Sequence, residues 1–126
     1  MVAVVWIAIG GALGATFRYG LTVLAGRIWP DQSLPIGTLA SNLIGCLCIG
    51  LLAGIAEGRV HFSPELRSFL FVGLLGGFTT FSSFGLETLL LLRGGGYGWA
   101  ALYVFFQVGI GLVAVAGGYA LGRMGA

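Results

Sequence analysis

Four long apolar runs dominate the sequence and leave few ways for the chain to fold. They cover Val2–Ala25, Ile36–Ala56, Leu66–Leu92 and Trp99–Leu121. Each run is long enough to cross about 30 Å of hydrocarbon as a helix. The chain is 58% hydrophobic and only 8% charged, which excludes an ordinary soluble domain. We therefore expect an all-α membrane protein in which residues 1–126 form a single domain of four transmembrane helices.

The third run contains the most unusual stretch of the sequence. Between Gly73 and Phe84, paired glycines and four hydroxyl residues occupy the depth at which hydrocarbon is expected. Paired glycines weaken a helix, and backbone that opens inside a bilayer is tolerated only where protein or a water-filled cavity satisfies its freed groups. A straight helix over this run would also be longer than the bilayer requires. The stretch predicts a break in the third helix that lines a polar pathway.

Polar side chains on the second and fourth runs are spaced so that they share helix faces. Thr38 and Asn42 lie one turn apart on the second run, and Tyr103 and Gln107 lie one turn apart on the fourth. An amide buried in lipid is costly unless it is paired, so Asn42 should face the interior of the bundle. It could serve there as a contact between helices or as a donor to a ligand. The neighbouring hydroxyl and glycine favour a pore.

Aromatic and hydroxyl side chains follow the expected break. Phe81 and Phe84 are three residues apart, so their rings should stack on one face, with Ser82 and Ser83 on its flanks. Ring edges carry positive potential and hydroxyls donate hydrogen bonds, a mixture that attracts an anion without holding it tightly. The alternative is that phenylalanines at this spacing are ordinary core residues.

Charged residues within the runs are rare. Gly10, Gly14 and Arg18 share a face on which small residues allow another helix to approach closely. Arg18 could snorkel to the headgroups, but its glycine-lined face favours a pore mouth, where its charge would concentrate anions. Glu87 is expected in a watery vestibule near a helix end, with a proton-coupling role as the alternative.

The arginines give almost no orientation bias. With four spans both termini share a side, on which Arg59, Arg67 and Arg123 fall. Arg27 and Arg93 fall on the other side, and Arg18 lies inside the first span towards Arg27. Because the imbalance of lysine and arginine normally sets topology, near balance suggests that copies insert both ways. Such insertion would permit an antiparallel dimer.

Glycines elsewhere predict close helix packing. Gly50 and Gly54 form a GxxxG pair on the second run. On the fourth run the expected close-packing positions are Gly109, Gly117, Gly118 and Gly122.

The expected break also predicts a place for a cation. Broken helices in transporters hold cations with unwound carbonyls, and such carbonyls are expected around Gly76 and Thr79. If the pathway conducts an anion, a small cation held there would be structural rather than transported.

Three blocks of the sequence resemble those of the Fluc/CrcB fluoride channels, and the likeness extends over essentially the whole chain. The blocks are GGALGATFRY from Gly10, GTLASNLIG from Gly37 and GGFTTFSSF from Gly76. The resemblance implies a dual-topology antiparallel homodimer in the bacterial inner membrane, with two fluoride pores and a central sodium ion. It further implies passive fluoride export that lowers cytoplasmic fluoride.

The resemblance also implies roles for particular residues. The fluoride pathway would comprise Thr38, Asn42, Phe81, Ser82, Ser83, Phe84, Tyr103 and Gln107. Arg18 and Glu87 would lie in the vestibules, and the backbone carbonyls of Gly76 and Thr79 would hold sodium. The chain departs from the family at Gln107, where members often place serine one turn after the fourth-helix tyrosine. An amide can also donate a hydrogen bond.

Two other functional classes are alternatives to the channel. Small multidrug transporters have a similar size and four helices, but they depend on a carboxylate in the first helix, where this chain has only Arg18. An accessory subunit would explain the glycines but not the clustered donors. Neither an enzyme nor a nucleic-acid-binding protein is expected, because the sequence offers no nucleophile with a base and no nucleotide-binding loop.

Overall fold

The computed structural model describes residues 1–58 and 60–125. Arg59, one of the arginines that bear on the orientation in the membrane, lies outside the described residues. The elements, in chain order, are α1 (Val2–Ile28), α2 (Ile36–Glu57), α3 (Pro64–Arg67), η1 (Ser68–Leu75), α4 (Gly76–Phe78), α5 (Phe81–Arg93), α6 (Tyr97–Val104), η2 (Phe105–Ile110) and α7 (Gly111–Gly125). The segments η1 and η2 are π-helical, a local widening of the helix that the sequence did not predict.

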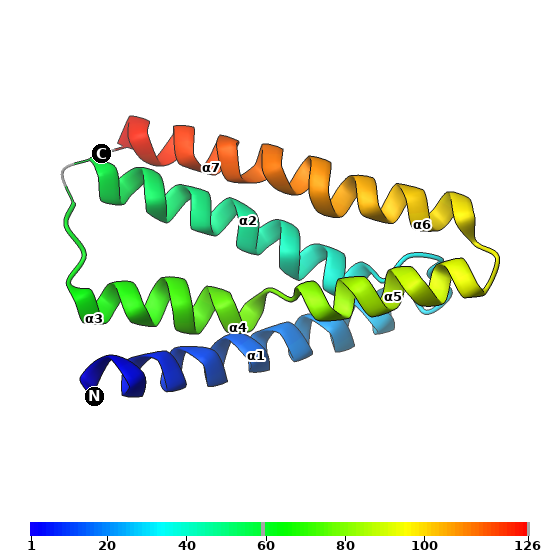
Figure 1. Ribbon diagram of the computed structural model, residues 1–126, viewed down its shortest axis with the longest axis horizontal. Helices are drawn as coiled ribbons and strands as arrows, with labels where there is room; N and C mark the ends of the chain where they lie inside the picture. The colour runs from blue at the N-terminus through cyan, green and yellow to red at the C-terminus, as the bar shows by residue number, and fades with distance from the viewer. Residues whose placement is uncertain (59, 126) are drawn as a thin grey trace.

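The four predicted spans are confirmed. Val2–Ile28, Ile36–Glu57, Pro64–Arg93 and Tyr97–Gly125 are each long and apolar enough to cross a membrane. They run side by side, with both termini at the same end of the bundle (Figure 1). Most large apolar side chains lie on the outside of the bundle, as expected where lipid replaces water. The chain is therefore a multi-pass membrane protein.

Two helix pairs build the bundle: α2 packs along α7, and α1 packs along η1 and α4 (Figure 1). Glycines bring the backbones of α2 and α7 together. A methyl group at Gly118 would lie 2.9 Å from the backbone nitrogen of Leu51, and one at Gly54 would lie 3.0 Å from that of Arg123. Close packing is thus confirmed at Gly54 and Gly118, as it is at Gly50 and Gly122.

Close packing against another span of the same chain was also predicted at Gly109 and Gly117, and there the prediction is wrong. Nothing lies within 4 Å of a methyl group built at Gly117. At Gly109 such a group meets only the Phe105 ring of its own helix, at 3.4 Å. Both residues lie on faces of the helix that no other span of the chain covers closely.

The third span is broken as predicted, but the break does not fall at the glycine pair. Gly76 and Gly77 are helical and belong to α4. The extended residues are Thr79, with φ −88° and ψ 159°, and Thr80, with φ −152° and ψ 122°. Helix α5 begins at Phe81.

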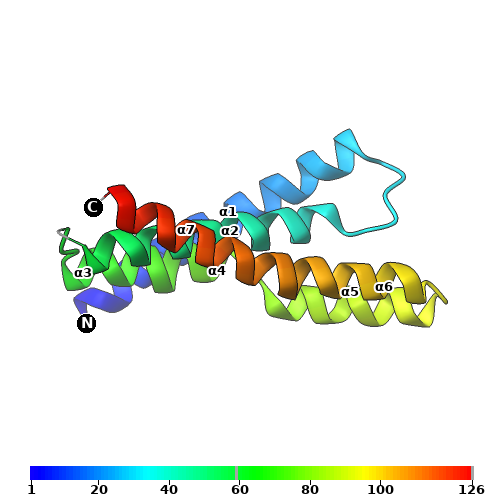
Figure 2. The same cartoon turned by 90° about the horizontal axis from the view of Figure 1, so that it is seen from above.

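Gly77 has a packing role instead. A methyl group there would lie 2.6 Å from the carbonyl oxygen of Gly11, so glycine is required because α1 passes close to α4. Beyond the break the bundle opens, and the α1–α2 connection diverges from the α5–α6 turn when the chain is seen from above (Figure 2).

Candidate functional site

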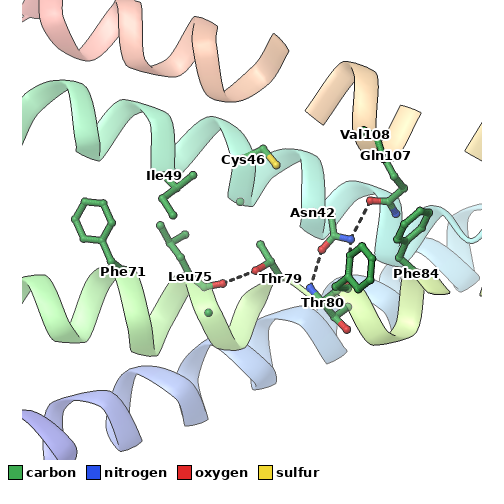
Figure 3. Close-up of a pocket in the computed structure, with 13 residues that line it drawn as sticks. Asn42, Cys46, Ile49, Phe71, Leu75, Thr79, Thr80, Phe84, Gln107 and Val108 are labelled. Carbon is green, nitrogen blue, oxygen red and sulfur yellow. Dashed lines mark hydrogen bonds between the residues drawn. The ribbon is translucent and has the colours of Figure 1, made fainter. Parts of the chain in front are cut away.

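The side chain of Asn42 reaches from α2 to the break and satisfies it. Its Oδ1 accepts a hydrogen bond from the backbone N–H of Thr80 at 2.8 Å, and its Nδ2 donates to the carbonyl of Thr80 at 2.9 Å (Figure 3). A side-chain amide thus replaces the backbone partners that a continuous helix would have provided. This pairing explains why the helix opens at Thr80 rather than at the glycines.

Thr80 also caps the start of α5, a role that was not predicted from the sequence. Its Oγ1 accepts from the backbone N–H of Ser83 at 3.1 Å, which makes it the N-cap of the helix. The same hydroxyl lies 3.2 Å from the Ser83 hydroxyl and 3.3 Å from the Ser82 hydroxyl. A threonine just ahead of a helical run is a capping signal, and it could have identified Thr80.

The stacking predicted for Phe81 and Phe84 is confirmed. Their ring centroids are 5.5 Å apart in an edge-on arrangement, and Phe84 lies 5.5 Å from the Tyr103 ring. The two phenylalanines differ sharply in burial, because Phe84 is 9% exposed and Phe81 is 81% exposed. Ordinary core packing within the chain therefore accounts for Phe84 but not for Phe81.

Glu87 is held by donors from two other spans. The Thr38 hydroxyl donates to Oε1 at 2.8 Å, and the Tyr103 hydroxyl, on a side chain with no exposed surface, donates to Oε2 at 2.6 Å. These bonds join α2, α5 and α6 into one polar cluster. Glu87 also lines a cavity of about 330 Å³ near the α5–α6 turn, with Pro35 and Gly94 among its other lining residues.

Gln107 extends the polar chain from the break to the fourth span. Its Oε1 accepts from Asn42 Nδ2 at 2.9 Å (Figure 3). Asn42, Phe81, Phe84 and Gln107 all line one cavity of about 340 Å³ at the break. The structure thus brings these four predicted residues together.

The other predicted pathway residues lie close by but do not line this cavity. Ser82 and Ser83 contact Thr80, while Thr38 and Tyr103 belong to the Glu87 cluster. The predicted polar side chains therefore form two neighbouring groups, which meet where Tyr103 lies beside Gln107.

Arg18 lies at the end of the first half of the broken helix. Its Nε donates to the carbonyl of Gly77 at 3.2 Å. The register follows from the glycine face of α1, because methyl groups at Gly10 and Gly14 would lie 2.8 Å and 2.7 Å from the backbone nitrogens of Leu74 and Phe78. The guanidinium therefore contacts protein at the break. A positive charge is favourable there, because it lies near the C-terminal end of α4.

The two carbonyls expected to hold a cation have lost their helical donors. In a continuous helix the N–H of Thr80 would bond to Gly76, and that of Ser83 would bond to Thr79. Here Thr80 N–H donates to Asn42 at 2.8 Å, and Ser83 N–H donates to the Thr80 hydroxyl at 3.1 Å. Within residues 1–58 and 60–125 no cluster of three or more His, Cys, Asp or Glu could hold a metal.

Comparison with known proteins places this chain in a family. Residues 5–119 match the family described as CrcB-like protein, Camphor Resistance (CrcB). The chain belongs to this family. Relatives named "Fluoride-specific ion channel FluC" include those of Methylobacillus flagellatus, 48% identical with 98% of this chain and 97% of the relative covered, and Salinibacter ruber, 49% identical with 99% and 94% covered. Another is that of Allorhizobium ampelinum, 44% identical with 95% of each chain covered.

Proposed function

We propose that this protein is a fluoride-selective channel that lets fluoride leave the cell passively and so lowers cytoplasmic fluoride. One observation carries the proposal: Asn42, Phe81, Phe84 and Gln107 converge on a single cavity at a helix break inside the membrane. Relatives of 48% and 49% identity, matched over almost their whole length, are named fluoride-specific ion channels. The family is one of channels, which also speaks against an enzymatic role.

The chemistry of the cavity suits a small anion. Fluoride is strongly hydrated and accepts hydrogen bonds well, so a pathway must replace its water with donors at close range. Amide and hydroxyl groups supply such donors, and the edges of the Phe81 and Phe84 rings supply weak positive potential. Weak attraction at several places lets an ion enter and leave, which conduction requires. We expect Ser82, Ser83, Thr38 and Tyr103 to continue the route.

A second, oppositely inserted copy would complete the pathway. Phe81 is 81% exposed in the single chain, so its ring meets either lipid or another subunit. Covering that ring with a partner would turn an open surface into an enclosed route. The near balance of arginines between the two sides supports an antiparallel dual-topology homodimer, with two such routes, in the bacterial inner membrane.

A structural sodium ion at the centre of that dimer fits the backbone at the break. The carbonyls of Gly76 and Thr79 have both lost their helical donors, and hard cations prefer oxygen ligands. One chain offers two such carbonyls, so a two-fold axis would supply two more. Bound there, sodium would supply positive charge that stabilises the unwound backbone.

Arg18 and Glu87 are expected near the ends of the route. The Arg18 guanidinium at the break would raise the local anion concentration. Glu87 would line a vestibule at the loop end, where it already borders a cavity.

Flux from liposomes that contain the purified protein tests the function. Passive fluoride release supports the channel. Proton exchange driven by a cationic drug supports the small multidrug exporter, which lacks support here because α1 contains no carboxylate. Absence of both activities supports an accessory subunit. Chemical cross-linking in the membrane tests the homodimer independently.

A further inference from the structure

Helix α2 contacts the break at a second position, one turn beyond Asn42 on the same face. Gly45, three residues after Asn42, lies against Thr79. A methyl group built at Gly45 would overlap Cγ2 of Thr79 and would lie 3.7 Å from Cδ1 of Phe78. Gly45 is buried and, like Thr79, lines the cavity of about 340 Å³. The absence of a side chain at Gly45 thus makes room for the Thr79 methyl group.

This contact differs from the other close glycine contacts of α2. At Gly37, Gly50 and Gly54 an added methyl group would first meet backbone atoms of another span. At Gly45 it would first meet the end of a side chain. A side chain can usually turn away from an added methyl group, so the contact is restrictive only if the Thr79 side chain is held in place.

A hydrogen bond holds the Thr79 side chain in place. Its Oγ1 donates to the carbonyl oxygen of Leu75 at 2.9 Å (Figure 3). The configuration at Cβ of threonine is fixed and its side chain is stiff, so fixing Oγ1 also fixes Cγ2. Turning the methyl group away from Gly45 would therefore break the bond to Leu75.

The peptide that joins Thr79 to Thr80 is oriented by the same face of α2. Its N–H donates to Asn42 Oδ1 at 2.8 Å. The peptide is trans, so its carbonyl, which belongs to Thr79, points the opposite way, away from Asn42. A side chain at Gly45 would push Thr79 away from α2 and weaken the bond between Asn42 and Thr80, because packed groups leave no space to absorb it.

We propose that Gly45 is a positioning residue of the conducting route. By admitting the Thr79 methyl group, it brings the Thr80 N–H within reach of Asn42 and turns the Thr79 carbonyl away from α2. The proposal rests on the proposed function, because the route is the one that would carry the ion. It goes beyond that function because Gly45 has no polar side chain and acts on the route only through its neighbours.

The shape of the contact supplies a specific test. Thr79→Ser keeps the hydroxyl that bonds to Leu75 but lacks Cγ2, the atom that a methyl group at Gly45 would overlap. Gly45→Ala is therefore compared in the wild-type and Thr79→Ser backgrounds. Gly50→Ala, on the same helix, is the matched control, because its methyl group would meet backbone atoms of α7. Fluoride release from liposomes is measured per amount of folded, monodisperse protein, well below the Tm of each variant.

The effect of Gly45→Ala should depend on residue 79. It should slow fluoride release at least about tenfold in the wild-type background and less than about threefold in the Thr79→Ser background. Gly50→Ala should have the same effect in both backgrounds. Equal losses from Gly45→Ala in the two backgrounds would overturn the proposal, and so would a lower Tm with unchanged release. If Gly45→Ala alone does not fold, the double variant should fold and conduct, and its failure would also overturn the proposal.

Hydrogen exchange at Thr80 separates positioning from packing alone. Protein that carries isotopically labelled threonine gives a signal for the Thr80 N–H, and Thr80→Ser identifies that signal by removing it. In Gly45→Ala this N–H should exchange with solvent at least about tenfold faster than in wild type, and adding Thr79→Ser should restore its protection. Unchanged exchange beside slowed release would contradict the positioning role. Failure of wild type to release fluoride would remove the proposed function, whereas a conducting wild type with an unaffected Gly45→Ala removes only this inference.

Discussion

Helix α2 contacts α7 and the broken third span in different ways. Towards its C-terminal end, glycines let the backbone touch α7, and the contact ends where Glu57 accepts from Tyr119 and from Arg123 Nη1, the latter at 3.3 Å. Towards its N-terminal end, Asn42 reaches across to a helix that has opened, and a cavity remains beside it. The glycine contact, at Gly50, Gly54, Gly118 and Gly122, excludes everything else, whereas the amide contact leaves room for an ion.

The difference shows what polar bridging does that close packing cannot. Backbones in contact leave no space between them, and any added methyl group must displace one helix. An amide bridge fixes two helices at a greater separation and supplies the hydrogen bonds that opened backbone needs inside a membrane. One helix can therefore anchor a rigid scaffold at one end and a conducting route at the other.

The largest expected effect comes from breaking the amide contact. Asn42→Asp retains an oxygen for the Thr80 N–H but removes the donors to the Thr80 carbonyl and to Gln107. Each buried group left unpaired costs about 1–3 kcal/mol, so fluoride release should fall about a hundredfold or more. The measurement is the initial rate in liposomes. Release at the wild-type rate would mean that the bridge is not needed for conduction.

A substitution in the glycine contact between α2 and α7 should lower the stability of the protein rather than its rate of fluoride release. Gly118→Ala places a methyl group against the backbone of α2, and overpacking of this kind costs about 1–3 kcal/mol. Gly117→Ala is a matched control because nothing lies within 4 Å of its methyl group. Thermal unfolding in detergent should show a lower Tm for Gly118→Ala only. Equal Tm values for the two variants would contradict close packing at Gly118.

Substitutions of Phe81 and Phe84 should separate an effect on conduction from an effect on stability within one site. Replacing Phe81 or Phe84 with isoleucine removes the ring edges, so each variant should slow fluoride release about tenfold. Phe84→Ile should also lower the Tm, because that ring is 9% exposed, whereas Phe81, at 81% exposed, should affect the stability of the single chain little. Rates are measured in liposomes and Tm values in detergent. Unchanged release in both variants would exclude a role for the rings.

The smallest expected effect comes from replacing Arg18, whose guanidinium donates to the Gly77 carbonyl at the break. Arg18→Lys keeps the charge near the C-terminal end of α4 but cannot reproduce the Nε bond to Gly77. A charge at a helix end is worth about 0.3–1 kcal/mol, which corresponds to about two- to fivefold in rate. Because the variant keeps this charge, its rate of fluoride release should fall by no more than that. Arg27→Lys, in the last turn of α1, serves as the control. A loss as large as that of Asn42→Asp would give Arg18 a more direct part in conduction.

Much of the fold could be predicted from the sequence, because it depends on local pattern. The number of spans and their approximate limits follow from hydropathy, and the edge-on pair of Phe81 and Phe84 follows from their spacing. Spacing alone could not separate Gly118 from Gly117, since neighbouring positions differ only in which face another helix covers. The hydropathy of the spans likewise gives no signal for the π-helical segments η1 and η2.

The sequence predicts which residues form the site but not how they contact one another. The sequence predicts a break between Gly73 and Phe84, with unwound carbonyls around Gly76 and Thr79, but it does not show that the glycine pair stays helical and that the extended residues are Thr79 and Thr80. Its position depends on Asn42, which lies far earlier in the chain and takes both backbone groups of Thr80. A bond between such distant residues leaves no local signal. The roles of the pathway residues and of a sodium ion stay predictions.

The most direct test of the central claim compares two halides in the same experiment. Liposomes that contain the wild-type protein are loaded with equal fluoride and chloride, and both ions are followed with selective electrodes after dilution. The amide-bridged break, with its ring edges and donors, predicts that fluoride leaves rapidly while chloride is retained. Release of both ions at similar rates, or retention of both, would contradict the claim that this break forms a fluoride-selective route.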